Sequence, residues 1–439
     1  MESAVPQWAA RIGRVFWSRP WLWAWVAVSI PLVPLLSFRR QSELVGCYLP
    51  ACQRLFDGLA LPGPEGWVYP PFFSTPTLLL ALLPLNAARV IWCATLVSCV
   101  LLAYRCIWRA VMTDGAFQSA VREPGRFFLF VAVLAMASAG HVLVPLGYQA
   151  HDPIVFMLLS LAAWRLAASR REGDGALDVQ TGVALGLAAS CKVMPVLALP
   201  VMVACGRWRI AASMAITGIV AAVGFDLVSL ALTGAHHFPD WVRLAAGGAD
   251  VSTAGGGRWG AWNPLNQSGT GILSRFITPT PPERGLGHDI MIVQLGETAR
   301  RVVLGGWVLL VLGGLLVASA ITSRRIRVRG CGASVPAFWS VAVIGATSCA
   351  YLLVAPHASN YHFAPVAIAA AGMAGWWIAR GVDWCMLLCL AVMVAIELVP
   401  GRDVLGGRLT DLKLSLGSVG ACALAGLVGS VRVMFRSAG

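Results

Sequence analysis

Apolar runs of membrane-span length alternate with short polar segments along this chain. The first run extends from Trp21 to Ser37 and the last from Leu414 to Val431. A run of about 20 apolar residues predicts a transmembrane helix, because a helix satisfies its backbone hydrogen bonds internally and therefore tolerates lipid. The pattern predicts an all-α, multi-pass membrane protein, organised as one integral-membrane domain over residues 1–439.

Arginines at the ends of the runs predict the orientation. Arg11, Arg14 and Arg19 precede the first run, which places the amino terminus in the cytoplasm, since cytoplasmic segments carry the excess of positive charge. Residues 38–85 then form a first external loop. Within it, the run Phe72–Leu85 contains two prolines and is too short to cross the bilayer upright. We therefore expect a re-entrant or interfacial helix there.

The remaining crossings follow from this orientation. Gly182–Cys205 begins and ends beside cytoplasmic polar groups, which predicts a hairpin of two short arms whose tip is Cys191–Pro195. A second long external loop covers residues 233–300. Counting both arms, we expect about twelve crossings with both termini inside. Besides the hairpin and the two terminal runs, the predicted crossings are Ala87–Trp108, Phe127–Leu146, Pro153–Ala168, Ile210–Leu232, Val302–Ile321, Ser340–Ala355, Ala364–Ile378 and Trp384–Val399.

Composition agrees with a membrane protein and limits the function classes. Hydrophobic residues make up 58% of the chain and charged residues 12%, whereas about a quarter of a soluble domain is charged. The net charge of +13 comes almost entirely from arginine, and arginines at span ends account for it without a nucleic-acid partner. The cysteines lie mostly inside apolar runs without metal-ligand spacing, so we expect buried thiols. No motif for a metal or another cofactor is present.

The polar groups that could perform chemistry concentrate in the predicted external loops. Residues 38–72 are the densest stretch and contain the carboxylates of Glu43 and Asp57. Lys192 is the only lysine inside an apolar segment. A lysine there is costly, so we expect it to be paired or to face a wet cavity, with snorkelling to the interface as the alternative. Other loops supply amide and imidazole groups: Gln149, Asn266, Gln267, His357 and His362.

Two groups of positive charges break the positive-inside rule. Arg39 and Arg40 directly follow the first span, and further arginines lie in residues 233–300. Positive charges held outside favour an anionic ligand there, such as a lipid phosphate. Long loops also translocate regardless of their charge, and for residues 233–300 the two explanations are equally good. For Arg39 and Arg40 we favour the functional one.

A series of short motifs carries a resemblance to a known family. In chain order they are Tyr48…Asp57-Gly58…Tyr69-Pro70-Pro71-Phe72, Pro84…Trp92, Gly147…Gln149, Lys192…Pro195 before Arg207-Trp208-Arg209, Asn266-Gln267-Ser268 and the loop Pro356…His362. From about residue 40 to residue 370 the chain resembles the polyprenyl-phosphate-mannose-dependent glycosyltransferases of family 87. These are GT-C-type membrane enzymes that include the mycobacterial phosphatidylinositol-mannoside α-1,2-mannosyltransferases and relatives transferring arabinofuranose.

One position departs from the family pattern. The family typically has an aspartate four residues before the tyrosine of the first external loop, and this chain has Leu44 there, with Glu43 displaced by one. Either Glu43 takes the role through a local shift, or the base lies elsewhere, with Asp57 next in line. The departure also leaves room for a divergent substrate or a lost activity.

The resemblance implies a GT-C-type bundle and an inverting transfer of a sugar, mannose by family frequency, from a polyprenyl-phosphate donor to a hydroxyl group of a lipid or glycan acceptor. The active site would face the periplasm or exterior of a bacterial inner membrane. No metal is required, because a monophosphate leaving group carries less charge than a nucleotide diphosphate. Two alternatives stay open: a polytopic transporter or lipid flippase, and a non-catalytic subunit with the same fold.

The implied chemistry assigns roles to the loop residues. Glu43 or Asp57 would take the proton of the acceptor hydroxyl. Lys192, His362 and Arg40 would stabilise the phosphate that leaves, because negative charge builds there in the transition state. The remaining expected substrate contacts are Tyr48, Tyr69, Gln149, Asn266, Gln267 and His357.

Overall fold

The chain is helical throughout the part that its structure describes. The computed structural model describes residues 20–39, 41–59, 69–169, 174–234, 236–248, 263–279, 290–329, 336–399 and 402–439. No strand occurs in these ranges, as the sequence predicts. Six of the described helices are long and apolar enough to cross a membrane, or up to seven if one bent pair counts as a span. The multi-pass class is therefore confirmed, while the count of about twelve crossings stays a prediction.

The elements keep one numbering along the chain, with η for short 3-10 and π-helical turns. The amino-terminal half contains α2 (Pro20–Ser37), η1 (Leu44–Tyr48), α3 (Leu49–Phe56), η2 (Pro71–Phe73), α4 (Ser74–Ala81), α5 (Leu85–Val111), α6 (Gly115–Ala120), α7 (Pro124–Met136), α8 (Ala139–Tyr148), α9 (Asp152–Ala168), α10 (Gly175–Cys191), η3 (Met194–Leu197) and α11 (Ala198–Ala204). The carboxyl-terminal half contains α12 (Trp208–Thr233), α13 (Phe238–Gly248), α14 (Gly269–Ile277), α15 (Glu297–Arg329), α16 (Ala337–Val354), η6 (Asn360–Phe363), α17 (Val366–Arg380), α18 (Trp384–Leu398), α19 (Arg402–Ser415) and α20 (Ser418–Ala438).

Helix α16 forms the centre of the bundle. Its side chains are buried almost all round, as expected for a helix whose whole circumference is apolar. It packs against α20, α17 and α9. A Cβ on Gly345 would lie only 2.9 Å from the Cα of Ala369 in α17, so small residues allow these two helices to approach closely. The packing fixes the two ends of the loop that carries η6.

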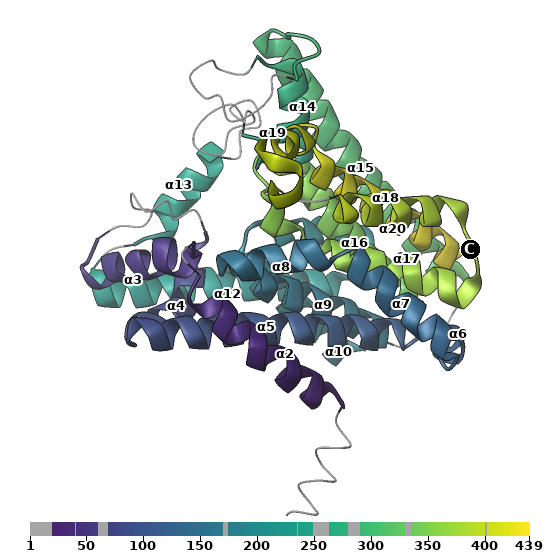
Figure 1. Ribbon diagram of the computed structural model, residues 1–439, viewed down its shortest axis with the longest axis horizontal. Coiled ribbons are helices and arrows are strands. Elements are labelled where there is room, and N and C mark those ends of the chain that lie inside the picture. The colour runs from purple at the N-terminus through teal and green to yellow at the C-terminus, as the bar shows by residue number, and fades with distance from the viewer. Residues whose placement is uncertain are drawn as a thin grey trace, which may run out of the picture.

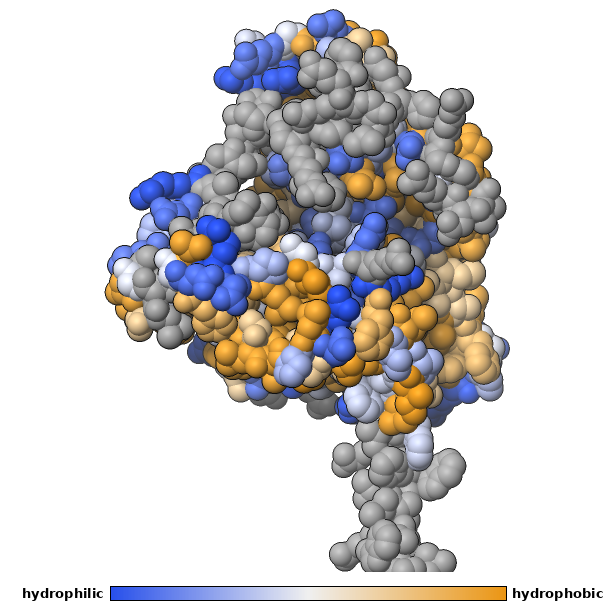
Figure 2. All heavy atoms as spheres, turned by 60° about the vertical axis from the view of Figure 1, so that its left-hand side comes forward, coloured by the Kyte–Doolittle hydropathy of each residue, from blue (hydrophilic) through white to orange (hydrophobic). Residues whose placement is uncertain are grey.

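The two ends of the bundle differ. Figure 1 shows α3 and α4 at one end, and α6 with the carboxyl terminus toward the other. This separation fits a first loop and a carboxyl terminus on opposite sides of a membrane. Figure 2 shows broad apolar areas on one face, with hydrophilic residues gathered above them. Ile216, Ile219 and Val220 of α12 are each more than 60% exposed, and such an apolar lateral surface is what lipid would cover.

The predicted run Phe127–Leu146 is two helices instead of one. Helices α7 and α8 are bent by 49° where they meet. Glu397 of α18 reaches the break, where its Oε2 accepts the backbone N–H of Gly140 at 2.8 Å. Its Oε1 lies 2.9 Å from Nε2 of His141. A distant helix thus satisfies an N–H group that the start of α8 would leave unpaired.

The predicted hairpin is interrupted where expected. Helix α10 ends at Cys191 and helical structure resumes with η3 at Met194. The first arm is longer than predicted, because α10 begins at Gly175 instead of Gly182. The eight residues of α4 are too few to cross a bilayer, which agrees with a re-entrant or interfacial helix. Helix α19 lies between the predicted crossing Trp384–Val399 and the last run, Leu414–Val431.

Candidate active site

A single π-helical turn follows Glu43. The turn, η1, covers Leu44–Tyr48 and leads directly into α3. In a π-turn the hydrogen bonds join residues five apart, so Glu43 and Tyr48 come to lie on the same side of the backbone. The hydroxyl of Tyr48 donates to Oε2 of Glu43 at 2.5 Å. Leu44, at the position where the resemblance implies an aspartate, is fully buried in the hydrophobic core.

Two tyrosines orient the Glu43 carboxylate. Besides Tyr48, the hydroxyl of Tyr69 donates to the same Oε2 at 3.0 Å. Burial raises the pKa of Glu43 above its usual range, although the Tyr48 and Tyr69 hydrogen bonds and the positive charge of Lys192 partly offset that increase. A carboxylate with a raised pKa is a better proton acceptor than an ordinary one near neutral pH.

Lys192 is paired, as the sequence predicts. Its Nζ lies 2.5 Å from Oδ1 of Asp152, and both side chains are more than 90% buried. Lys192 follows the end of α10 in an extended conformation, and Asp152 belongs to the first turn of α9, where Pro153 occupies a position that needs no backbone donor. The interruption after α10 and the start of α9 therefore bring the two charges together.

His151 connects this ion pair to the tyrosines. Its Nδ1 lies 2.9 Å from the hydroxyl oxygen of Tyr48, which also accepts the backbone N–H of His151 at 3.2 Å. Burial lowers the pKa of His151, and the charge of Lys192 lowers it further, while a hydrogen bond with the backbone of Cys191 partly offsets the decrease. Since Tyr48 gives its only hydrogen to Glu43, Nδ1 of His151 is the donor in their contact.

The η6 turn brings a third segment to the same place. Tyr361 interacts with Glu43, and Nζ of Lys192 lies 5.9 Å from the centre of the Tyr361 ring. The next residue, His362, interacts electrostatically with Lys192, His151 and His357. The backbone N–H of Ser359 donates to Nδ1 of His362 at 3.3 Å, which leaves the proton of a neutral His362 on Nε2.

The three predicted amide contacts are occupied by the protein itself. Gln149 is buried, donates to the carbonyl of Leu36 at 2.7 Å and accepts from the hydroxyl of Ser42. It also has φ of 55°, which is uncommon outside glycine and lets the chain reverse after α8. The side chain therefore fixes the end of α2 beside η1, which gives Gln149 a positioning role, and its expected substrate contact stays a prediction.

Asn266 and Gln267 also bind main-chain groups. Asn266 donates to the carbonyl of Pro356 at 3.0 Å and accepts the N–H of Ala358 at 3.2 Å. Gln267 donates to the carbonyl of Leu414 at 2.7 Å and accepts the N–H of Val419 at 3.2 Å. Both side chains are buried, and these hydrogen bonds hold the loop before η6 against α19 and α20.

The other predicted residues are placed differently. Asp57 is exposed at the end of α3, where its Oδ1 accepts from Nε2 of Gln53 at 2.9 Å, and the structure does not bring it to Glu43. His357 is half-buried near His362. Arg40 lies outside the described residues. Within the described ranges, no group of histidine, cysteine and carboxylate side chains is arranged to hold a metal ion.

Sequence reasoning did not select three members of this cluster, namely His151, Asp152 and Tyr361. The local sequence does indicate the position of Asp152, because a carboxylate followed by proline is typical of a helix start. An ion pair for the only lysine in an apolar segment also requires an acid nearby. His151 and Tyr361 had no comparable local signal beyond their place in polar loops.

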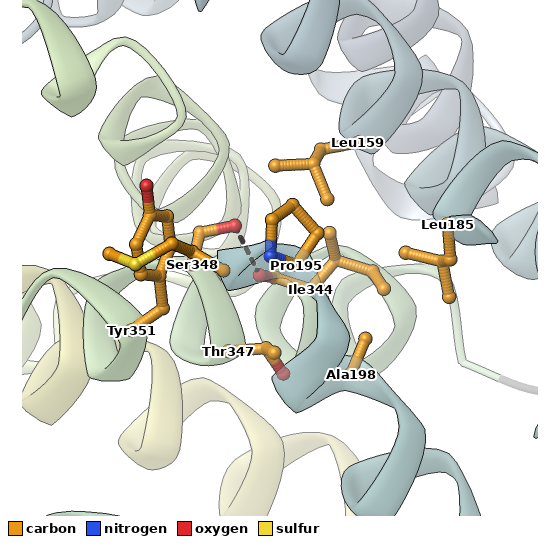
Figure 3. Close-up of a pocket in the computed structure, with 9 residues that line it drawn as sticks. Leu159, Leu185, Pro195, Ala198, Ile344, Thr347, Ser348 and Tyr351 are labelled. Carbon is orange, nitrogen blue, oxygen red and sulfur yellow. Dashed lines mark hydrogen bonds between the residues drawn. The ribbon is translucent and has the colours of Figure 1, made fainter. Parts of the chain in front are cut away.

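A small cavity lies next to the cluster and is too small to hold a sugar. Figure 3 shows it between Pro195 and Ala198 on one side and Ile344 and Thr347 of α16 on the other. Its volume is about 10 Å³, which is enough for about one water molecule. Tyr351, at its edge, interacts electrostatically with Asp152. The substrate therefore needs a space other than this cavity.

One of three comparisons with known proteins found a match. The family model of glycosyltransferase family 87 matches residues 67–356, a narrower range than the resemblance from about residue 40 to residue 370. The match includes Tyr69 and Lys192, whereas Glu43, Tyr48 and His362 lie outside it. No curated protein and no solved structure matches the chain. The family match covers more than half of the chain, which therefore belongs to glycosyltransferase family 87, a family of membrane glycosyltransferases.

Proposed function

We propose that this glycosyltransferase moves mannose from a polyprenyl-phosphate donor to a hydroxyl group of a lipid or glycan acceptor, with inversion at the anomeric carbon, at the periplasmic face of a bacterial inner membrane. One observation carries the proposal: a half-buried carboxylate, Glu43, shares a cluster with Lys192 and His362. The choice of mannose and of the polyprenyl carrier rests on the family resemblance.

Glu43 is the proposed general base. The acceptor oxygen attacks the anomeric carbon while Glu43 takes its proton, so one C–O bond forms as the acceptor O–H bond breaks. The Tyr48 and Tyr69 hydrogen bonds hold the carboxylate in one orientation, which reduces the cost of reaching a reactive geometry. The raised pKa of Glu43 gives the proton transfer a larger driving force than an exposed carboxylate would.

Lys192 and His362 are the proposed stabilisers of the leaving phosphate. The bond between the anomeric carbon and the phosphate oxygen breaks with its electron pair on that oxygen, and nearby cations or N–H donors stabilise the charge. Asp152 orients the Lys192 ammonium through their contact. Because Nδ1 of a neutral His362 accepts a backbone hydrogen bond, its Nε2–H is left to donate to the phosphate. No metal is needed for this step, because the leaving group is a monophosphate.

The external location is supported by the position of the cluster in the fold. Glu43 precedes η1 and α3, which lie at the end of the bundle away from the carboxyl terminus. Arginines before α2 favour a cytoplasmic amino terminus, so the segment after α2 would be external. An external site excludes nucleotide sugars and fits a lipid-linked donor.

The test is sugar transfer by purified variants. Wild-type protein, incubated with radiolabelled polyprenyl-phosphate-mannose and bacterial lipid extract, should form a labelled product. Glu43→Gln should lower turnover by roughly 10²-fold or more while donor binding persists. Asp57→Asn is the matched control and should keep wild-type turnover, because Asp57 is exposed and bonded only within α3. Full turnover in Glu43→Gln would refute the base assignment, and absence of both donor binding and transfer in the wild type would refute the proposed donor.

A further inference from the structure

His151 is a buried side chain to which the proposed chemistry assigns no role. It is 0% exposed and lies at the start of α9, directly before Asp152. Other rings enclose the imidazole: the ring centre of Phe73 lies 4.2 Å from it and that of Tyr69 lies 4.5 Å from it. A polar group is costly in such surroundings unless it is hydrogen-bonded, so the hydrogen bonds of His151 indicate what it does.

These hydrogen bonds converge on the hydroxyl oxygen of Tyr48. Nδ1 of His151 lies 2.9 Å from that oxygen, and the backbone N–H of His151 donates to the same oxygen at 3.2 Å. Tyr48 has a single hydroxyl hydrogen, which it donates to Oε2 of Glu43. The tyrosine oxygen thus accepts two hydrogen bonds from one residue, and with both lone pairs occupied it directs its hydrogen to the carboxylate.

Contacts within the protein hold His151 in place. Gln149 adopts the left-handed conformation at the end of α8, and its carbonyl oxygen accepts from Nε1 of Trp92 at 2.8 Å. Asp152, the residue after His151, lies 2.5 Å from Nζ of Lys192. Two consecutive residues therefore contact the two halves of the cluster, His151 on the side of the base and Asp152 on the side of the cation.

We propose that His151 is a positioning residue that acts on Glu43 through Tyr48, by directing and strengthening the hydrogen bond that Tyr48 donates to the base. Hydrogen bonds in a chain polarise one another, which strengthens each by about 10–30%. A stronger hydrogen bond to the ionised carboxylate favours its charged form and lowers the pKa of Glu43. His151 thus keeps the buried base deprotonated at a lower pH than it would be without this contact. The inference rests on the proposed role of Glu43 as the base.

Other groups also act on Glu43 and His151. Besides Tyr48, Glu43 is influenced by the hydroxyls of Tyr69 and Tyr361 and by the charges of Asp152 and Lys192. The imidazole of His151 is influenced by Lys192, His362 and the backbone of Cys191. A substitution of His151 leaves all of these groups in the protein. Its effect on the titration of Glu43 can therefore be assigned to the Tyr48 contact by a double-variant comparison.

Two substitutions separate the hydrogen bond of His151 from its packing. His151→Phe keeps a ring beside Phe73 and Tyr69 but has no donor, whereas His151→Asn loses the ring and keeps an N–H near the position of Nδ1. Where His151→Phe does not fold, His151→Leu replaces it as a second side chain without a donor. The pH–rate profile of sugar transfer from labelled polyprenyl-phosphate-mannose is measured for each variant.

The acidic limb of the profile should move to higher pH in His151→Phe by about half a pH unit, because the hydrogen bond that stabilises the ionised base is weakened. The KM for the donor should stay unchanged. His151→Asn should restore the wild-type limb, whereas a purely structural role predicts that Phe, which preserves the packing, is the milder substitution. An unmoved limb in His151→Phe would overturn the proposal, and so would equal shifts in the two variants.

A double variant and a matched control identify the route. In Tyr48→Phe the contact is already lost, so adding His151→Phe should shift the limb no further. A second full shift would show that His151 acts on Glu43 by another route and would overturn the proposal. The control is His141→Phe, because His141 is also a buried histidine beside a carboxylate, with its Nε2 2.9 Å from Oε1 of Glu397. Its limb should coincide with that of wild type, and a shift as large as in His151→Phe would count against a specific contact.

Infrared titration of Glu43 needs no substrate and distinguishes this inference from the proposed function. The carbonyl band of the protonated carboxyl is identified by its absence from Glu43→Gln, and its midpoint should move to higher pH in His151→Phe. A moved midpoint together with full turnover of Glu43→Gln would refute the base and leave the contact through Tyr48 standing. An unmoved midpoint together with lost turnover in Glu43→Gln would refute the role of His151 and leave the base assignment intact.

Discussion

The buried pair of Lys192 and Asp152 allows stability and activity to be separated. Nζ of Lys192 and Oδ1 of Asp152 are 2.5 Å apart, and the two side chains are 8% and 4% exposed, respectively. Removing one partner leaves a buried charge without compensation, which costs about 3–5 kcal/mol. Replacing both by apolar residues of similar volume is often neutral or stabilising. We therefore expect Lys192→Met and Asp152→Leu each to lower the unfolding temperature, and the double variant to recover most of the loss.

Activity should follow a different pattern. If Lys192 stabilises the leaving phosphate, both variants that lack it should lose transfer by roughly 10²-fold or more, including the stable double variant. Thermal unfolding in detergent and transfer from labelled polyprenyl-phosphate-mannose measure the two effects on the same samples. Arg380→Met is the control, because its ion pair with Asp114 is 48% exposed on the arginine side and should cost only about 0–1 kcal/mol.

Two results would refute this reasoning. A double variant that transfers sugar at the wild-type rate would show that Lys192 has no part in the chemistry. Stability losses that simply add in the double variant would show that the two side chains do not compensate each other.

The remaining predictions concern the base and its supports. Transfer should fall as the pH drops through the pKa of Glu43, because the base must be deprotonated, and burial places this acidic limb above the range of an ordinary carboxylate. Tyr48→Phe removes a hydrogen bond that lowers the pKa of Glu43, so the limb in a pH–rate profile should move to higher pH. A limb that moves to lower pH would contradict this. Asn266→Ala should lower the unfolding free energy by about 1–3 kcal/mol, since it leaves the buried backbone N–H of Ala358 without its acceptor. Denaturant unfolding measures it, and donor affinity should stay at the wild-type value.

The helices and their local interruptions could be predicted from sequence because their causes are local. The break after α10 coincides with Met194-Pro195, where proline removes a backbone donor. The start of α9 coincides with Asp152-Pro153. The bend between α7 and α8 could not be predicted from the local sequence. The N–H of Gly140 at the bend is bound by Glu397 of α18, which is far away in the chain.

The main charges of the cluster could be picked out from the sequence, whereas the hydrogen-bond partners of the amides could not. Glu43 and Lys192 stand out because an ionisable group beside or inside an apolar run is costly without a purpose. Gln149, Asn266 and Gln267 also lie in polar loops, and sequence does not reveal that main-chain partners such as the carbonyls of Leu36 and Leu414 already occupy them. An amide suits a sugar and a peptide group equally well, so only the packed structure decides between them.

The π-turn changes the meaning of the one departure from the family pattern. An α-helix turns by about 100° per residue, so a carboxylate four residues before a tyrosine lies about 40° from it around the axis, while one five residues before lies about 140° away. In regular α-helix, Glu43 would face away from Tyr48. Hydrogen bonding between residues five apart in η1 brings it back, and the contact of 2.5 Å between the two side chains follows. The alternative of a non-catalytic subunit relied on the missing carboxylate at position 44. The π-turn holds one residue more than an α-helical turn and so compensates for the displacement of the carboxylate to Glu43.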